Sequence, residues 1–180
     1  MGTTHNVVSS PIGNLTIVVN DGKLTGVYQE GQVNFPNKRE LGALDINDVI
    51  SETSKQIKEY FAGERAVFDL PLAESDTEFR REVLAATQAI PYGEVATYGD
   101  LADKMGKARA TVYVAGALNV NKLTIVVPCH RVIGLKGSRY VADVEHKEFL
   151  QKLEASHRDK FASPAKKKGL LARLFGPSPA

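Results

Sequence analysis

The hydrophobic pattern of the chain changes once, near residue 75, and this change limits the folds that the chain can adopt. Before it, strand-like runs cover residues 6–9, 15–19 and 24–28, with turn-forming residues between them. After it, apolar residues recur at helical spacing. The pattern predicts an α/β unit with a small sheet and a helix, followed by a mostly α-helical unit.

The N-terminal unit is expected to contain antiparallel hairpins and one helix. Residues 10–13 and 20–22 are rich in turn formers and would connect the strands. Asn47 is suited to cap a helix that runs to about Phe61. Residues 67–72 are expected to form an extended connector to the second unit.

The C-terminal unit begins with a sequence that indicates three helices. Asp76 is suited to cap the first helix, which stops before Pro91. A second helix is expected over residues 98–105 and a third over 108–118, with Gly106 in the turn between them. Two short helices joined in this way are typical of a helix-turn-helix, although most such pairs serve only in packing.

The remaining segments complete the expected domain organisation. Residues 123–127 are predicted to form a buried strand, and residues 144–155 a last helix. We expect an N-terminal domain at residues 1–72, a C-terminal domain at 76–155 and a basic tail at 156–180. Such a tail attracts polyanions, or serves only to keep the protein in solution. The charges from Ala155 onward are Arg158, Asp159, Lys160, Lys166, Lys167, Lys168 and Arg173.

Composition excludes several classes of protein. The single cysteine cannot form an internal disulfide, so we expect a reducing compartment: the cytoplasm, or the nucleus if the source is eukaryotic. The longest apolar runs are too short to span a bilayer, and the N-terminus lacks a secretory pattern. No cluster of ligands at zinc-like spacing is present, so no metal site is expected. We expect a monomer without a membrane partner.

Cys129 is the residue whose surroundings most suggest chemistry. A lone cysteine is more often a small buried apolar residue than a nucleophile. Here it follows a proline, His130 is a base with a pKa near neutrality, and Arg131 adds positive charge that favours the thiolate. We expect the sulfur to be exposed and readily ionised, at the mouth of a pocket.

His130 is not expected to touch the sulfur directly, because neighbours in an extended segment point to opposite faces. A proton relay through one trapped water would connect them. The imidazole then needs an acceptor on its other nitrogen, and Glu154 on the last helix is the candidate. The alternative for Glu154 is a solvated carboxylate near a helix end.

The segment around Cys129 resembles the active-site signature of the O6-alkylguanine-DNA alkyltransferases (methylated-DNA–protein-cysteine methyltransferases). The resemblance is close from Phe79 to Glu154 and looser at residues 10–13. The matching octapeptide is Val127-Pro128-Cys129-His130-Arg131-Val132-Ile133-Gly134. Further matches are Phe79, Val83, Ile90-Pro91-Tyr92-Gly93-Glu94-Val95, Thr97-Tyr98-Gly99, Leu101-Ala102, Asn121, Gly137, Tyr140, Lys147 and Leu153-Glu154.

The resemblance implies a fold and a set of catalytic roles. The N-terminal domain would have an RNase H-like sheet, and the C-terminal domain would carry the helix-turn-helix. Cys129 would accept the alkyl group, activated by Glu154 and by His130 through water. Asn121 would lie in a hinge beside the active-site loop, and Tyr98 would assist the guanine leaving group.

The resemblance also implies a substrate pocket and a DNA surface. Tyr140, the following Val141 and Val132 would form the pocket for the base. Residues expected to face alkylated double-stranded DNA are Thr97, Lys107, Arg109, Val112 and Arg131. The target nucleotide would be turned out of the stack, at a cost of a few kcal/mol.

The implied activity is direct-reversal DNA repair with a single turnover and no cofactor. A thiolate displaces the alkyl group from guanine O6, and the thioether product has no easy route to hydrolysis. Two other readings are a non-enzymatic module that binds alkylated DNA and, less favoured, a cysteine hydrolase. The adjacency of cysteine and histidine argues against the hydrolase.

Two segments depart from the family pattern. Val112 stands where an arginine normally enters the DNA stack, and the following residues 113–115 are bulkier than usual. Residues 141–143 replace a glycine-rich stretch, which restricts the backbone there. The combination fits a divergent natural enzyme or a variant that reacts mainly with free benzylguanine-type substrates.

Overall fold

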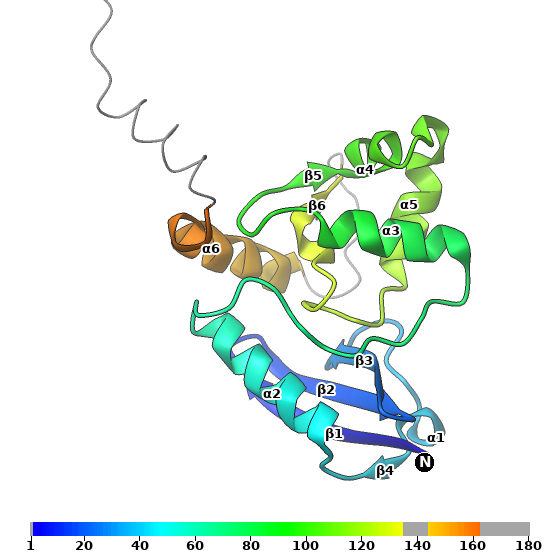
Figure 1. The fold of residues 1–180 in the computed structure, drawn as a ribbon, viewed down its shortest axis with the longest axis vertical. Coiled ribbons are helices and arrows are strands. Elements are labelled where there is room, and N and C mark those ends of the chain that lie inside the picture. Colours follow the sequence, from blue (N-terminus) through cyan, green and yellow to red (C-terminus); the bar gives the residue numbers. More distant parts are fainter. Residues whose placement is uncertain (1, 135–143, 163–180) are drawn as a thin grey trace, which may run out of the picture.

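The computed structural model describes residues 2–134 and 144–162. The predicted pocket residues Tyr140 and Val141 lie outside these ranges, as does most of the predicted basic tail. The N-terminal half is a sheet covered by a helix, and the C-terminal half is mainly helical (Figure 1).

The sheet has four strands in the order β3-β2-β1-β4. The antiparallel strands are β1 (Thr3–Ser10), β2 (Gly13–Asn20) and β3 (Lys23–Gln29), while β4 (Ala43–Leu44) pairs in parallel with β1. Asp21 and Gly22 both have positive φ, at 48° and 76°, as the tight turn between β2 and β3 requires. The predicted hairpins are therefore confirmed.

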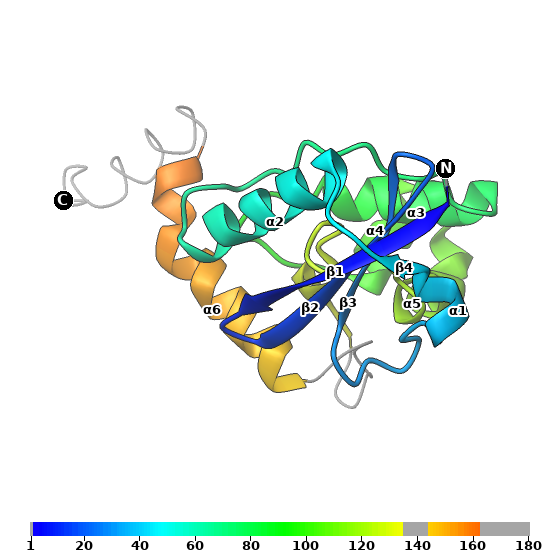
Figure 2. The same cartoon turned by 90° about the horizontal axis from the view of Figure 1, so that it is seen from below.

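Helix α2 (Asp48–Phe61) lies across one face of this sheet (Figure 2). Asn47 caps it as predicted, because its side chain accepts a hydrogen bond from the Ile50 amide at 3.0 Å. The inward face of the helix carries Ile50, Ile57 and Tyr60, all almost fully buried. A one-turn helix, α1 (Lys38–Leu41), precedes β4.

The C-terminal half contains the predicted helix pair. Helix α3 (Glu78–Gln88) is capped by Thr77 and not by Asp76, whose carboxylate instead pairs with Arg80. Helix α4 (Tyr98–Lys104) and helix α5 (Thr111–Asn119) form the helix-turn-helix. The third predicted helix begins as the 3-10 turn η1 (Ala108–Ala110), since no side chain caps its first turn.

The predicted strand at residues 123–127 is wrong. The segment is a buried turn that makes only isolated bridges, one of them between Leu123 and Val27 of β3. Val127 donates a backbone hydrogen bond to Leu123 at 2.8 Å, and Ile125 has a φ of 73°. Its apolar side chains are buried because the segment lies between the two halves. The apolar run therefore indicated that the segment is buried, but not that it pairs as a strand.

The active-site segment follows directly. It consists of the 3-10 turn η2 (Cys129–Arg131) and strand β6 (Val132–Ile133), which pairs in parallel with β5 (Ala96–Thr97). Helix α6 (Val144–Phe161) extends six residues beyond the predicted end at Ala155. The Phe161 ring packs on Tyr92, with 4.9 Å between centroids, which continues the buried side of the helix.

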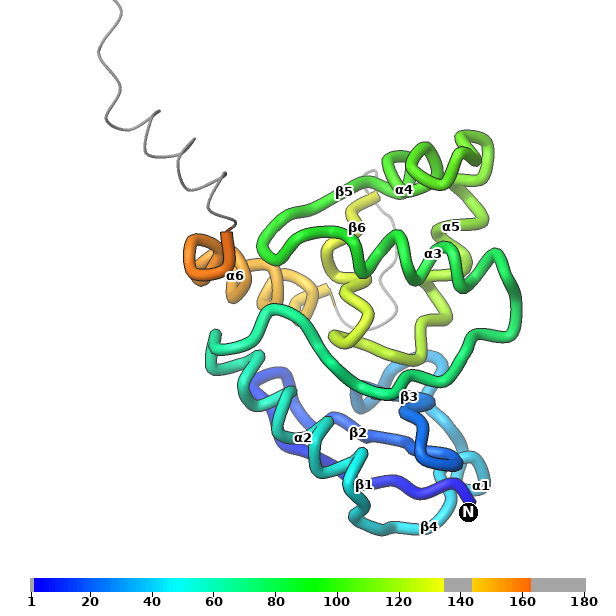
Figure 3. The backbone as a smooth tube through the Cα atoms, viewed as in Figure 1, coloured from blue at the N-terminus to red at the C-terminus, as the bar shows by residue number. Residues whose placement is uncertain are grey.

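Besides the connecting chain, hydrogen bonds and a shared hydrophobic core join the two halves. The connector between them runs along their boundary (Figure 3), and Leu24 of β3 exchanges hydrogen bonds with Pro71 and Ala73. One hydrophobic core cluster combines sheet residues with Ile125, Val127 and Leu150 from the C-terminal half. A second cluster lies within the helical half and includes Cys129.

Among the residues that the structure describes, no helix has both the length and the apolar character needed to cross a bilayer.

Candidate active site

Cys129 is buried, with 3% of its surface exposed, so the expectation of an exposed sulfur is wrong. The 3-10 turn directs the side chain into the second core cluster, beside Tyr98 and Val132. The site nevertheless has polar character. The Asn121 side-chain amide donates to the sulfur at 3.2 Å, and the predicted neighbourhood of Asn121 and Cys129 is therefore present.

Asn121 is fixed by several contacts besides the one to the sulfur. Its amide nitrogen also lies 3.3 Å from the Val127 carbonyl, and its side-chain oxygen accepts from the Leu123 amide at 3.0 Å. From the N-terminal half, the Gln32 side chain donates to the Asn121 backbone carbonyl at 3.2 Å. The Asn121 side chain thus connects the segment after α5 to the active-site turn.

His130 is fully buried and lies in the same 3-10 turn as Cys129, not in an extended segment as expected. Its Nε2 is 2.6 Å from Glu154 Oε1. Burial lowers the pKa of His130 more than the neighbouring carboxylate raises it, so the imidazole is neutral at neutral pH. Within the described part of the chain, Nδ1 has no hydrogen-bond partner, which leaves it as the proton-accepting nitrogen.

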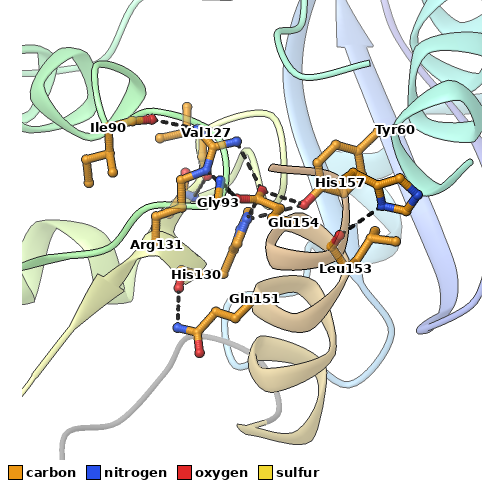
Figure 4. A network of polar contacts seen from close by, with 11 residues as sticks. Tyr60, Ile90, Gly93, Val127, His130, Arg131, Gln151, Leu153, Glu154 and His157 are labelled. Atoms are coloured by element: carbon orange, nitrogen blue, oxygen red, sulfur yellow. Dashed lines mark hydrogen bonds and ion pairs between the residues drawn. The ribbon is translucent and has the colours of Figure 1, made fainter. Parts of the chain in front are cut away.

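Glu154 is 1% exposed, so the alternative of a solvated carboxylate is wrong. Its Oε1 receives Tyr60 Oη at 2.7 Å, His130 Nε2 and Arg131 Nη2, and its Oε2 receives Arg131 Nε and the Gly93 amide (Figure 4). Burial opposes ionisation, but the hydrogen bond and charge of His130 and the ion pair with Arg131 lower the pKa to about 2. The carboxylate is therefore ionised and fully hydrogen-bonded.

Arg131 does not face solvent, so the prediction that it contacts DNA is wrong. Only 6% of its surface is exposed, and its guanidinium binds Glu154 through two nitrogens and the Ile90 carbonyl through the third. The guanidinium also lies 5.5 Å from the Tyr92 ring centroid. Its charge is balanced by Glu154, which weakens the predicted influence of Arg131 on the thiolate.

Tyr98 and Val132 lie beside the cysteine. Tyr98 is the first residue of α4 and is 9% exposed. Burial raises its pKa, and so does the charge of Cys129, so the phenol keeps its proton and is able to donate it. Val132 is fully buried in the same cluster, and its carbonyl accepts from Lys147 Nζ at 2.7 Å. Burial lowers the pKa of Lys147, and the nearby charge of Cys129 offsets part of this shift.

The other predicted DNA-facing residues lie on the exposed side of the helix-turn-helix. Thr97 caps α4 through the Asp100 amide at 3.0 Å, and Lys107 forms an ion pair with Glu82. Arg109 is exposed in η1. At the start of α5, Val112 is 79% exposed. Each of these side chains is thus accessible to a macromolecule.

The structure adds residues that the sequence did not single out. Tyr60 and Gln32 reach the site from the N-terminal half, 94 and 89 positions away from their partners Glu154 and Asn121. No local motif marks either residue, because each is defined only by a contact between distant segments. In the part of the chain that is described, no group of three or more His, Cys, Asp or Glu side chains is placed to hold a metal ion.

The fold and the site together match one family over most of the chain. Residues 4–73 match the ribonuclease-like domain of 6-O-methylguanine DNA methyltransferase, and residues 78–156 match its DNA-binding domain. The chain therefore belongs to the 6-O-methylguanine DNA methyltransferase family. This confirms both the predicted resemblance and the predicted fold class, an RNase H-like α/β domain before a mostly α-helical domain with a helix-turn-helix.

Individual relatives carry the activity in their names. A methylated-DNA–protein-cysteine methyltransferase of Methanosarcina acetivorans is 39% identical over 157 residues, covering 84% of this chain and 98% of the relative. The constitutive methylated-DNA–protein-cysteine methyltransferase of Bacillus subtilis is 36% identical over 132 residues, covering 72% and 80%. The crystal structure of Mycobacterium tuberculosis OGT in complex with DNA superposes with a TM-score of 0.76 at 34% identity, covering 86% and 94%.

Proposed function

We propose that this protein performs direct-reversal DNA repair, by irreversible transfer of an alkyl group from guanine O6 in double-stranded DNA to Cys129. The observation that carries the proposal is the site itself. A cysteine held by Asn121 is followed in the chain by a neutral His130, which is bound to an ionised Glu154. Members of the family to which the chain belongs are named for transfer to cysteine.

Activation of the thiol uses the neutral imidazole as a base. The proton of Cys129 passes through a water molecule to His130 Nδ1, while Nε2–H donates to Glu154. The imidazolium that forms is stabilised by the adjacent carboxylate, as in other nucleophile–base–orienter sites. Asn121 donates to the sulfur and stabilises the thiolate as it develops.

The transfer step is a displacement at carbon. The Cys129 sulfur forms a bond to the alkyl carbon, and the bond between that carbon and guanine O6 breaks. The electron pair goes to the guanine, which takes a proton from the Tyr98 phenol. The products are a thioether and an unmodified guanine, so each molecule reacts once and needs no cofactor.

Access to O6 requires a flipped nucleotide. Thr97, Lys107 and Arg109 would contact the backbone, and Val112 would fill the place that an arginine takes in the family. Tyr140, Val141 and Val132 would line the pocket for the purine. We further propose that the protein acts as a monomer. Its compartment would be the cytoplasm or the nucleus, since the acceptor must remain a free thiol.

Mass spectrometry after incubation with an O6-methylguanine duplex tests this function. One methyl group should replace the thiol hydrogen of Cys129 in at most one equivalent, and Cys129→Ala should remain unmodified. Binding without any mass gain would indicate a damage-binding module instead. A mass gain only with free benzylguanine would restrict the activity to small substrates.

A further inference from the structure

One hydroxyl of the N-terminal half lies inside the network that activates Cys129. Tyr60, near the end of α2, donates to Glu154 Oε1 at 2.7 Å and lies 3.3 Å from His130 Nε2. We propose that Tyr60 is a positioning residue for alkyl transfer: its hydroxyl fixes the carboxylate oxygen that orients the His130 imidazole. The proposal rests on the proposed function, because it assigns Tyr60 a place in that reaction.

Tyr60 holds the carboxylate oxygen that faces the imidazole, from the side of the N-terminal half. Oε2 of Glu154 is held by Gly93 and Arg131, whereas Oε1 is the oxygen that faces the imidazole. Tyr60 and Arg131 are the other donors to Oε1. Of these donors, Tyr60 alone belongs to the N-terminal half, so that half completes the set of hydrogen bonds to the carboxylate beside His130 (Figure 4).

The direction of the hydrogen bond is fixed by the charges. Burial, and then the neighbouring Glu154 carboxylate, raise the pKa of Tyr60 well above its ordinary value. The phenol therefore keeps its proton throughout the physiological range. The single proton points to the ionised Glu154, while His130 Nε2 donates to the same oxygen.

The position of the Tyr60 ring is determined by packing. It is fully buried, and its centroid lies 5.6 Å from that of Phe68, 6.1 Å from that of Tyr92 and 6.4 Å from that of the His130 ring. A hydroxyl held so rigidly limits rotation of the carboxylate and of the imidazole bonded to it. Because Tyr60 is buried away from the helix-turn-helix, its loss should change the rate of transfer and not the affinity for DNA.

The test compares Tyr60→Phe with the unchanged protein in single-turnover transfer from a saturating methylated duplex between about pH 5 and pH 9. The plateau rate should fall roughly tenfold, the factor that corresponds to one net hydrogen bond to a charged group. Without the Tyr60 donor, Glu154 becomes a stronger acceptor for His130. The pKa of His130 should therefore rise, and the acidic limb of the pH–rate profile should move to higher pH.

Thr53→Val is the matched control. It removes a buried hydroxyl from the same helix, and among the described residues this hydroxyl bonds only to the Val49 carbonyl. It should leave both the rate and the pH profile unchanged. Replacement of Tyr60 by a fluorinated tyrosine keeps the hydroxyl and strengthens its donation, so the acidic limb should move to lower pH. This second variant still tests the role of Tyr60 if Tyr60→Phe does not fold.

The proposal is overturned if Tyr60→Phe and the fluorinated variant both keep the rate and pH profile of the unchanged protein. It is also overturned if the loss of rate in Tyr60→Phe only follows a loss of folded protein while the fluorinated variant keeps the pH profile of the unchanged protein. Failure of the proposed function looks different, since the unchanged protein would then transfer nothing. In that case an NMR titration of His130 still decides the role of Tyr60.

Discussion

At the scale of single residues, the site depends on two adjacent groups that are both deprotonated, one of them neutral and the other negatively charged. His130 is buried and neutral, and Glu154 is buried and ionised. The difference arises from their partners, because Glu154 has the Arg131 charge and five hydrogen bonds, while burial dominates for His130. Such a pair keeps the imidazole ready to accept a proton and stabilises the cation once formed.

Glu154→Gln should slow alkyl transfer by roughly 100-fold, because the imidazolium loses its neighbouring charge. The substitution also leaves the buried Arg131 guanidinium without a counter-ion, and should lower the free energy of unfolding by roughly 3–5 kcal/mol. Single-turnover kinetics and urea denaturation measure the two effects. An unchanged rate in a folded Glu154→Gln protein would exclude Glu154 from the mechanism.

The same residues predict how stability depends on pH. Glu154 titrates at about 2 in the folded protein against an ordinary 4.5, and the pKa of His130 also lies below its ordinary 6.5. A lowered folded pKa stabilises the protein above the unfolded pKa, and this contribution is lost as the pH falls. The free energy of unfolding should decline from about pH 6.5 downward, with Glu154 contributing on the order of 3 kcal/mol between about pH 5 and pH 2.

Urea titrations at several pH values check this prediction, with Glu154→Gln as the comparison. The variant should show a flatter dependence below about pH 5, since it lacks the titrating carboxyl. Parallel curves for the two proteins would show that other carboxyls cause the acid instability.

At the scale of elements, the second helix of the helix-turn-helix has an unusual beginning. η1 carries the exposed Arg109, and α5 then presents Val112 and Tyr113, which are 79% and 71% exposed. Apolar side chains at this place are able to act as wedges in DNA but add no attraction to phosphate. The second helix of the helix-turn-helix is therefore present, but η1 and α5 together carry a single charged side chain, that of Arg109.

Val112→Arg should strengthen binding to a methylated duplex and steepen its dependence on salt by about one ion, as expected for one added phosphate contact. Transfer from free benzylguanine should not change, because Cys129 and its partners are untouched. The control is Val67→Arg, which adds the same charge at an exposed position in the connector. Equal gains from both variants would mean that only net charge matters, and would contradict a specific role for position 112.

Several elements were predictable because their signals are local. The Asp21-Gly22 turn, the Asn47 cap and the helix pair around Gly106 each depend on residues a few positions apart. The errors occurred where distant contacts decide the outcome. Residues 123–127 form a buried turn because they fill the boundary between the halves, and α6 continues to Phe161 because that ring packs on Tyr92.

At the scale of the whole molecule, the N-terminal half supports the active site from two directions. Tyr60 contacts Glu154, and Gln32 contacts the Asn121 carbonyl while accepting from the Thr124 hydroxyl at 3.0 Å. The first core cluster also crosses the boundary. The two halves are therefore expected to unfold together in one transition.

Gln32→Leu should lower the free energy of unfolding by about 1–3 kcal/mol, because it leaves the buried Thr124 hydroxyl without its acceptor. Calorimetry should still show a single transition at a lower temperature. Val33→Ala, at a neighbouring position that is 92% exposed, should change the stability by less than about 0.5 kcal/mol. Two separate transitions in either protein would contradict the coupling of the halves.

The sequence by itself determined the family, the candidate nucleophile and the order of the two halves with their main helices. These features depend on short motifs, such as the segment from Val127 to Gly134, and on local conformational propensities. Only the tertiary structure decided that Cys129 and Arg131 are buried, that Glu154 is enclosed, and that Tyr60 joins the network. Burial and long-range hydrogen bonds depend on which distant segments meet, and no short stretch of sequence carries that information.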